Sequence, residues 1–126
     1  SPLEVLRELH RTARPGASLW MVTPFLWEEH QKPHDYYRYT SDGLTYLLSQ
    51  SRWEVKEIRP AGGYFQVMAR RSVNLLSFFQ GGWRWLFFPV LAPIFGLLLP
   101  LLLCFLDPLD RQRHFTLGHI IRAVAR

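Results

Sequence analysis

The sequence is poor in cysteine and lysine, and it has no zinc-binding signature. Cys104 is the one cysteine among 126 residues, so an internal disulfide is excluded. Neither zinc-finger spacing nor an HExxH motif is present. Thirteen of the fifteen basic residues are arginines, and they are spread along the chain. Despite a formal net charge of +5, this dispersion argues against a dedicated DNA- or RNA-binding domain.

A long apolar run is present instead. Residues 86–106, "LFFPVLAPIFGLLLPLLLCFL", include no charged side chain. A helix of that length would be about 30 Å long, enough to cross a bilayer core. Three prolines and Gly96 argue against one straight helix, so we predict two short helices that form a re-entrant or interfacial hairpin. The alternative is an apolar subdomain packed on the core or on a second subunit.

The remaining chain alternates between helical and strand patterns. We predict helices over residues 1–13, from Thr40 onward and over 64–79, and strands over 17–25, 53–58 and 119–124. This order indicates an α/β fold. The first strand shows no clean alternation, which predicts burial on both faces, as in a parallel sheet. Three strands are too few for a complete doubly wound sheet, so we expect further strands upstream of Ser1.

The stretch "HQKPHDYYRYT", residues 30–40, directly follows the first predicted strand. Ligands of open α/β sheets bind beyond the carboxyl ends of strands, so this loop is the candidate functional segment. A metal site is disfavoured because Pro33 disrupts the helical geometry that would align His30 with His34. A histidine beside an aspartate can act as a base near neutral pH, which makes His30, His34 and Asp35 candidate catalytic residues.

The aromatic and basic residues of the loop suggest substrate binding. Tyr36 and Tyr39 could wall a pocket, and Arg38 could hold a carboxylate or phosphate. The alternative is a packing loop over the sheet edge, in which Asp35 caps a turn and Arg38 pairs with a nearby acid.

Together these segments resemble class I S-adenosylmethionine-dependent methyltransferases. The stretch "LRELHRTARPGASLWMVTPF" is similar to the helix, Pro-Gly turn and fifth strand of that family. Its continuation, "HQKPHDYYRYTSDGLTYLLSQSRWEVKEIRPAGG", resembles a bacterial, methyltransferase type 11-like subgroup. The end, "DPLDRQRHFTLGHIIRAVAR", resembles that subgroup's final strand, which closes the sheet. The likeness covers nearly the whole chain and is weakest over the apolar insertion.

The resemblance implies that residues 1–126 are the C-terminal, substrate-side part of a Rossmann-like methyltransferase sheet. An apolar helical insertion, at about 64–110, would precede the last strand. The family's glycine-rich cofactor loop and its ribose-binding acid are absent from the sequence and are expected upstream. S-adenosylmethionine would be the methyl donor, with Pro24 and Phe25 near its sulfur.

The resemblance also implies roles for the loop. His30 or His34 would be the general base, and Asp35 would orient it. Tyr36, Arg38 and Tyr39 would contact the substrate.

We therefore expect a methyltransferase acting on a small, amphiphilic or envelope-related molecule. It would be cytoplasmic and peripheral to, or anchored in, the inner membrane through residues 86–106. The alternative is a non-catalytic membrane-associated or interaction protein. Neither a metal nor a nucleic-acid partner is expected, and the sequence leaves the oligomeric state open.

Overall fold

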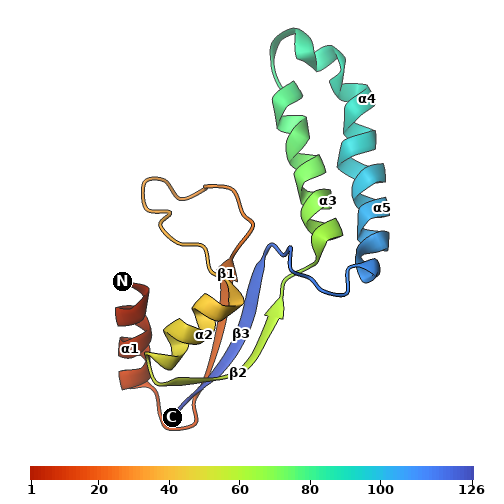
Figure 1. The fold of residues 1–126 in the computed structure, drawn as a ribbon. Coiled ribbons are helices and arrows are strands. Elements are labelled where there is room, and N and C mark those ends of the chain that lie inside the picture. The colour runs from red at the N-terminus through yellow and green to blue at the C-terminus, as the bar shows by residue number, and fades with distance from the viewer. The chain divides into compact units, whose positions relative to one another are not determined.

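The computed structural model describes residues Ser1 to Arg126, which form two compact units (Figure 1). The sheet unit comprises residues 1–61 and 118–126, and the hairpin unit comprises residues 62–117. The insertion predicted at about 64–110 therefore corresponds to a separate compact unit of slightly greater extent.

The sheet unit is a mixed α/β arrangement, which confirms the predicted α/β class at this coarse level. Its elements are α1 (Pro2–Thr12), β1 (Ser18–Pro24), α2 (Ser41–Ser49), β2 (Trp53–Pro60) and β3 (Gly118–Ala125). The strand order is β1-β3-β2, and β3 pairs antiparallel with both neighbours. The expectation of parallel pairing for the first strand is wrong within this chain. Because β3 returns between β1 and β2, the two strands that run in the same direction are not adjacent.

One face of the sheet carries the core. Buried side chains of α1, α2 and the strands pack together there: Leu6, Leu44, Leu48, Trp53, Ile121, Ala123 and Ala125. The indole Nε1 of Trp53 donates to the carbonyl oxygen of Leu6 at 2.9 Å, which ties β2 to α1. Thr40 caps α2 as predicted, since its hydroxyl accepts from the amide of Gly43 at 3.1 Å.

The opposite face of β1 is exposed. Trp20 and Val22 are 59% and 73% exposed, whereas Met21 packs against the core. The guanidinium of Arg122 on β3 lies 5.8 Å from the centre of a Trp20 ring. The prediction that this strand is buried on both faces is therefore wrong for the described residues, because helices cover only one side of it.

In the hairpin unit, α3 (Tyr64–Leu75) packs against α5 (Leu99–Leu106) and the π turn (Ile94–Leu98). α4 (Phe88–Pro93) precedes the π turn in the same helical run and contacts the residues that follow α3. Short 3₁₀ turns at Leu76–Phe79 and Gly82–Leu86 connect them, and another at Asp107–Leu109 follows α5. The prediction of a hairpin within 86–106 is wrong, because this segment is a single arm. Its partner is α3.

The prolines are accommodated within that arm. Pro89 lies in the first turn of α4, where an amide donor is not needed. Pro93 and Pro100 flank the π turn, which is where helices absorb a change in hydrogen-bond register. Ser72 of α3 donates its hydroxyl to the carbonyl oxygen of Phe95 at 3.3 Å within this turn. The helix therefore continues through the prolines instead of breaking.

The amino end of α3 is capped from a distant part of the chain. Its N-cap residue is Gly63, which has no side chain to cap with. Asp110 accepts from the amide of Tyr64 at 2.7 Å, and Asp107 accepts from the amide of Gln66 at 3.3 Å. A Cβ on Gly63 would lie 2.9 Å from an oxygen of each carboxylate, so a side chain there would displace both capping groups. The amides of Tyr64 and Arg113, in that order of effect, lower the pKa of Asp110.

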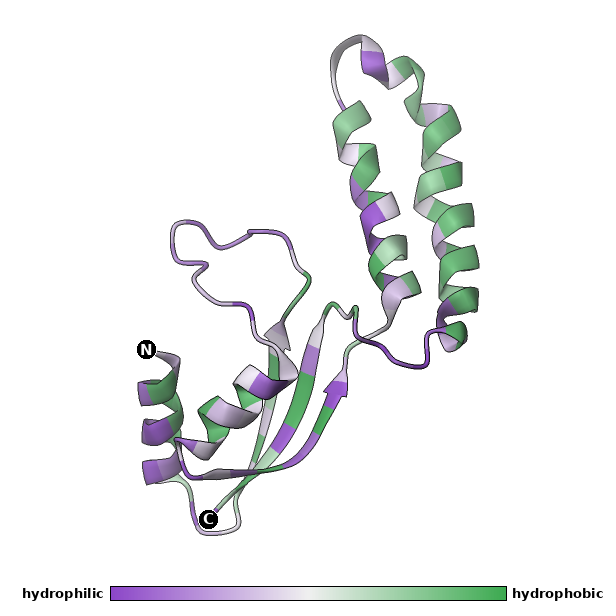
Figure 2. Ribbon diagram, in the orientation of Figure 1, coloured by the Kyte–Doolittle hydropathy of each residue, from purple (hydrophilic) through white to green (hydrophobic).

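The hairpin unit exposes most of its apolar side chains. Its buried hydrophobic residues are Val67 and Ala69, both on α3, and none lies on α4 or α5. Residues Phe88–Leu109 form one helical run of mean hydropathy 2.4, long and apolar enough to cross a membrane. Figure 2 shows α4 and α5 as almost continuously hydrophobic, whereas α3 also carries hydrophilic stretches.

Candidate functional site

The loop between β1 and α2 leaves the carboxyl end of β1 and returns to it. The amide of Tyr39 donates to the carbonyl oxygen of Pro24 at 3.2 Å, which closes the loop at its base. Pro24 and Phe25 thus lie where the loop begins, at the carboxyl end of β1. The sequence analysis predicted the functional segment at this strand end.

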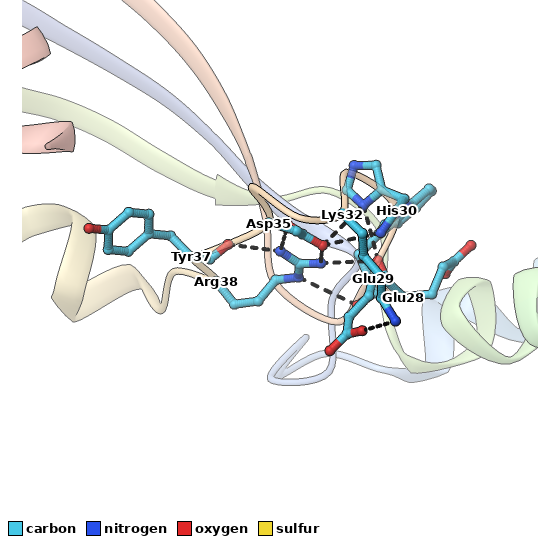
Figure 3. A network of polar contacts seen from close by, with 8 residues as sticks. Glu28, Glu29, His30, Lys32, Asp35, Tyr37 and Arg38 are labelled. Atoms are coloured by element: carbon cyan, nitrogen blue, oxygen red, sulfur yellow. Dashed lines mark hydrogen bonds and ion pairs between the residues drawn. The ribbon is translucent and has the colours of Figure 1, made fainter.

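An ion pair holds the interior of this loop (Figure 3). Arg38 pairs through both terminal nitrogens with Asp35, at 2.5 Å and 2.6 Å. The same guanidinium donates to the backbone carbonyl oxygens of Trp27, Glu28 and Tyr37 at 3.4, 3.0 and 2.9 Å. All five N–H groups of Arg38 are thereby engaged inside the loop. Arg38 acts in this arrangement as an internal support, and binding a substrate anion would require it to exchange these bonds.

Asp35 is the centre of the network. Its side chain is only 9% exposed, and its Oδ2 also accepts from the amide of His30 at 3.1 Å. The hydrogen bonds from Arg38 hold the pKa of this carboxyl far below its usual range, with a smaller contribution from the His30 amide. Asp35 in turn raises the pKa of Arg38. Asp35 is therefore ionised at neutral pH. It accepts hydrogen bonds in this network and has no proton to donate as a general acid.

The ring of His30 is oriented by a hydrogen bond from its Nδ1 to the loop backbone. Its Nδ1 lies 3.0 Å from the carbonyl oxygen of Glu28, and because a carbonyl only accepts, Nδ1 carries a proton. The neutral ring then has Nε2 as its unprotonated nitrogen, which is the arrangement a general base needs. Oδ2 of Asp35 lies 3.7 Å from the same Nδ1. The carboxylate therefore lies near His30.

His34 has a different partner, although it precedes Asp35 in the sequence. Its Nδ1 is 3.0 Å from the hydroxyl oxygen of Tyr36, and the two rings meet edge-on at 5.9 Å. No hydrogen bond joins the His34 and Asp35 side chains among the contacts described. Of the two candidate histidines, His30 is the one whose ring lies near the Asp35 carboxylate, at 3.7 Å.

The tyrosines continue as a row. Tyr36 meets Tyr37 edge-on at 6.4 Å, and Tyr37 stacks on Tyr39 at 5.9 Å with 15° between the ring planes. Tyr36 and Tyr37 are 69% and 51% exposed, whereas Tyr39 packs against the core. Burial raises the pKa of Tyr39, and the neighbouring Tyr37 adds to the effect. Tyr36 and Tyr37 therefore present their rings to solvent, while Tyr39 anchors the row to the core.

Two buried polar residues at the end of β1 were missed by the sequence reasoning. Thr23 and His119 are 7% and 8% exposed and are paired across β1 and β3. Thr23 Oγ1 and His119 Nδ1 are buried without a hydrogen-bond partner. Burial lowers the pKa of His119, and a hydrogen bond with the backbone of Tyr39 opposes that effect. The available signal was a histidine at the start of the mostly apolar strand "GHIIRAV".

The surroundings of this pair connect it to the loop. The Phe25 and His119 rings are 5.6 Å apart. Thr23 and Tyr39 both line a small apolar cavity between α1 and α2. A Cβ on Gly118 would clash with the carbonyl oxygen of Thr23, so glycine is required where β3 enters the sheet. The loop that carries His30 and the tyrosine row therefore begins and ends beside a buried threonine–histidine pair at the end of β1.

No group of three histidine, cysteine, aspartate or glutamate side chains is arranged to hold a metal ion. Comparison with protein-family models, with curated proteins and with solved structures finds no match for this chain.

Proposed function

We propose that this chain is the substrate-side part of an S-adenosylmethionine-dependent methyltransferase acting on a small, amphiphilic molecule. The observation that carries the proposal is the closed loop at the carboxyl end of β1, with the Nε2 of His30 available as a base. The strand order supports it. Class I methyltransferase sheets end with an antiparallel strand inserted between the two strands that precede it, which is the order β1-β3-β2.

The chain by itself is not expected to bind the methyl donor. The turn between β2 and α3, Ala61-Gly62-Gly63, lacks the G-x-G-x-x-G spacing of a cofactor loop, and none of the strands ends in an acidic residue that could hold a ribose. S-adenosylmethionine, when bound, supplies an electrophilic methyl group. Pro24 and Phe25 are the proposed neighbours of that group, and the unpartnered Thr23 and His119 atoms are buried polar groups that a ligand could satisfy.

The loop would act on the methyl acceptor. Nε2 of His30 would accept the proton that the nucleophile loses, while Glu28 and Asp35 hold the ring. Tyr36 and Tyr37 would wall the substrate with their exposed faces. Arg38 would position the loop through Asp35 and not contact the reacting atoms.

The coding region upstream of Ser1 is the first test. A strand, a glycine-rich turn and helix, and then an acidic strand end would support the proposal; an upstream region without this pattern would overturn it. In the full-length product, methyl transfer from labelled S-adenosylmethionine to an envelope lipid extract should fall by a factor of roughly 10² or more in His30→Ala. His114→Ala, an exposed histidine of the hairpin unit, is the matched control and should retain activity.

A second candidate is a non-catalytic membrane-associated or interaction protein. The exposed apolar run Phe88–Leu109 favours it. The two candidates differ in what the loop does. Full-length protein that binds membranes but shows no transfer, together with a His30→Ala variant indistinguishable from the parent, would favour the non-catalytic role.

A further inference from the structure

We propose that the hairpin unit lies in the plane of an anionic membrane, with α4 and α5 among the acyl chains and α3 at the headgroups. The inference rests on residues 62–117 alone and does not depend on the methyltransferase proposal. It specifies an orientation, which the length and hydropathy of the apolar run do not provide.

The outward side of α4–α5 is the first observation. Large apolar side chains remain exposed along its length: Leu86, Val90, Leu97, Leu98, Leu101, Leu102, Phe105 and Leu109. Phe105 is 81% exposed. Exposed apolar surface of this extent marks an interaction site in a natural protein.

The width of that surface argues for lipid over a second protein helix. Leu97 and Leu102 are separated by roughly 140° around the helix axis at ~100° per residue, and both are more than half exposed. A single partner helix contacts a narrower seam. Acyl chains are fluid and cover the entire stripe, and residues 86–106 include no charge that would oppose their contact.

The polar side of α3 is the second observation. α3 approaches the apolar arm through Ser72, which bonds Phe95, and Leu76 directly after α3 lies against Gly96. Arg70, Asn74 and Ser77 follow one another at helical spacing on the opposite side. The hairpin unit thus joins an apolar arm to a helix that carries hydrophilic residues in its middle (Figure 2), which is the pattern of an interfacial element.

The placement of charge and tryptophan argues against a crossing orientation. Arg70 and Arg71 lie in the middle of α3, so a hairpin that crossed the bilayer would carry both into the hydrocarbon. At the tip, Trp83 and Trp85 flank Arg84, and tryptophan and arginine favour the headgroup level. In the plane of the membrane, the middle of α3 and the tip both remain at that level.

The net charge of the unit specifies the kind of lipid. Residues 62–117 contain five arginines and two aspartates. Anionic headgroups attract such a surface by about 1 kcal/mol for each basic residue near it. The expected partner is therefore a bilayer that contains anionic phospholipid, not a neutral one.

Vesicle flotation tests the lipid preference on the full chain. With vesicles of phosphatidylcholine and phosphatidylglycerol, the chain should float, and Arg70→Gln/Arg71→Gln should weaken binding by roughly 10- to 30-fold. Arg7→Gln/Arg14→Gln removes the same charge from exposed positions of the sheet unit and should weaken it much less. Leu98→Gln/Phe105→Gln should reduce flotation on every vesicle, whereas Val22→Gln, an exposed apolar position of β1, should not.

Thiol labelling tests the orientation. Cys104, exposed on α5, is the only native cysteine, so single-cysteine variants require one replacement. In sealed vesicles with protein added outside, Cys104 should be protected from a membrane-impermeant maleimide. Ser77→Cys in the 3₁₀ turn that follows α3 and Gln80→Cys at the tip, each with Cys104→Ala, should react without opening the vesicles.

Three results would overturn the proposal. A Gln80→Cys thiol that reacts only after the vesicles are opened would mean that the hairpin crosses the bilayer. A stable dimer that ignores vesicles would mean that a second copy covers the apolar stripe. Equal binding to neutral and anionic vesicles, unchanged in Arg70→Gln/Arg71→Gln, would remove the role assigned to α3.

Discussion

Arg38 and Arg11 are both paired with a carboxylate three residues away, but their surroundings differ. Arg11 meets Glu8 on the exposed surface of α1, where such pairs contribute little. Arg38 is three-quarters buried and also holds three backbone carbonyls of the loop. Lysine cannot reproduce this planar, five-donor geometry. Arg38→Lys should therefore open the loop, and amide hydrogen exchange over residues 25–39 should accelerate by roughly tenfold or more.

Arg11→Lys is the matched control for that experiment. It should leave exchange in α1 and in the loop nearly unchanged, because the Glu8 pair is solvated. Unaltered loop exchange in Arg38→Lys would show that the five hydrogen bonds do not hold the loop closed.

His119 predicts a pH dependence of the sheet unit. Its folded-state pKa is lowered by burial, so the unfolded chain takes up a proton at a higher pH than the folded one does. Stability is therefore greatest above the ordinary histidine pKa of about 6.5 and declines as the pH falls from there toward the folded-state pKa. Urea unfolding monitored by tryptophan fluorescence should show a lower midpoint at pH 5 than at pH 7.5.

The cause can be assigned with one substitution. His119→Asn removes the titrating group and should flatten the decline between pH 7.5 and pH 5. A decline of the same size in His119→Asn would assign it to another group.

At the scale of elements, α3 shows what a distant cap contributes. Asp107 is 3% exposed and bonds both the amide and the side chain of Gln66. Asp107→Ala leaves these donors without their acceptor, which should cost about 1–3 kcal/mol locally. Amide exchange at Gln66 should accelerate, whereas exchange in α2, which has its own Thr40 cap, should not. Asp107→Asn retains an acceptor oxygen and should lie between the parent and Asp107→Ala.

The cap of α3 also illustrates which features could not be predicted from local sequence patterns. Local signals predicted α1, α2 and the three strand segments, because caps and periodicity act within a few residues. The cap of α3 comes from Asp107 and Asp110, more than forty positions away, and no local pattern specifies it. Likewise, the pairing of His30 with Asp35 depends on how the loop folds back, and adjacency in sequence favoured His34 instead. The strand order depends on a β3 strand that follows the entire hairpin unit.

At the scale of the whole molecule, the two units should be separable. The buried core cluster lies entirely in the sheet unit. The two residues that flank the hairpin unit in the sequence are also in contact: the amide of Ala61 donates to the carbonyl oxygen of Gly118 at 2.9 Å. Replacing residues 62–117 by Asn-Gly would join β2 to β3 through a two-residue turn, the connection that antiparallel strands favour.

The shortened chain should fold, and the rest of the sheet unit explains why. Its strands keep their register, Trp53 keeps its bond to Leu6, and no buried member of the core cluster is removed. Its thermal midpoint should remain within about 5 °C of that of the sheet unit in the full chain, because this shift corresponds to only about 1 kcal/mol. The shortened chain should also lose flotation on anionic vesicles, since the apolar stripe and the arginines of α3 are both gone. A shortened chain without cooperative unfolding would show that the sheet unit needs the hairpin unit to fold, whereas one that folds and still floats would place membrane binding on the exposed face of β1.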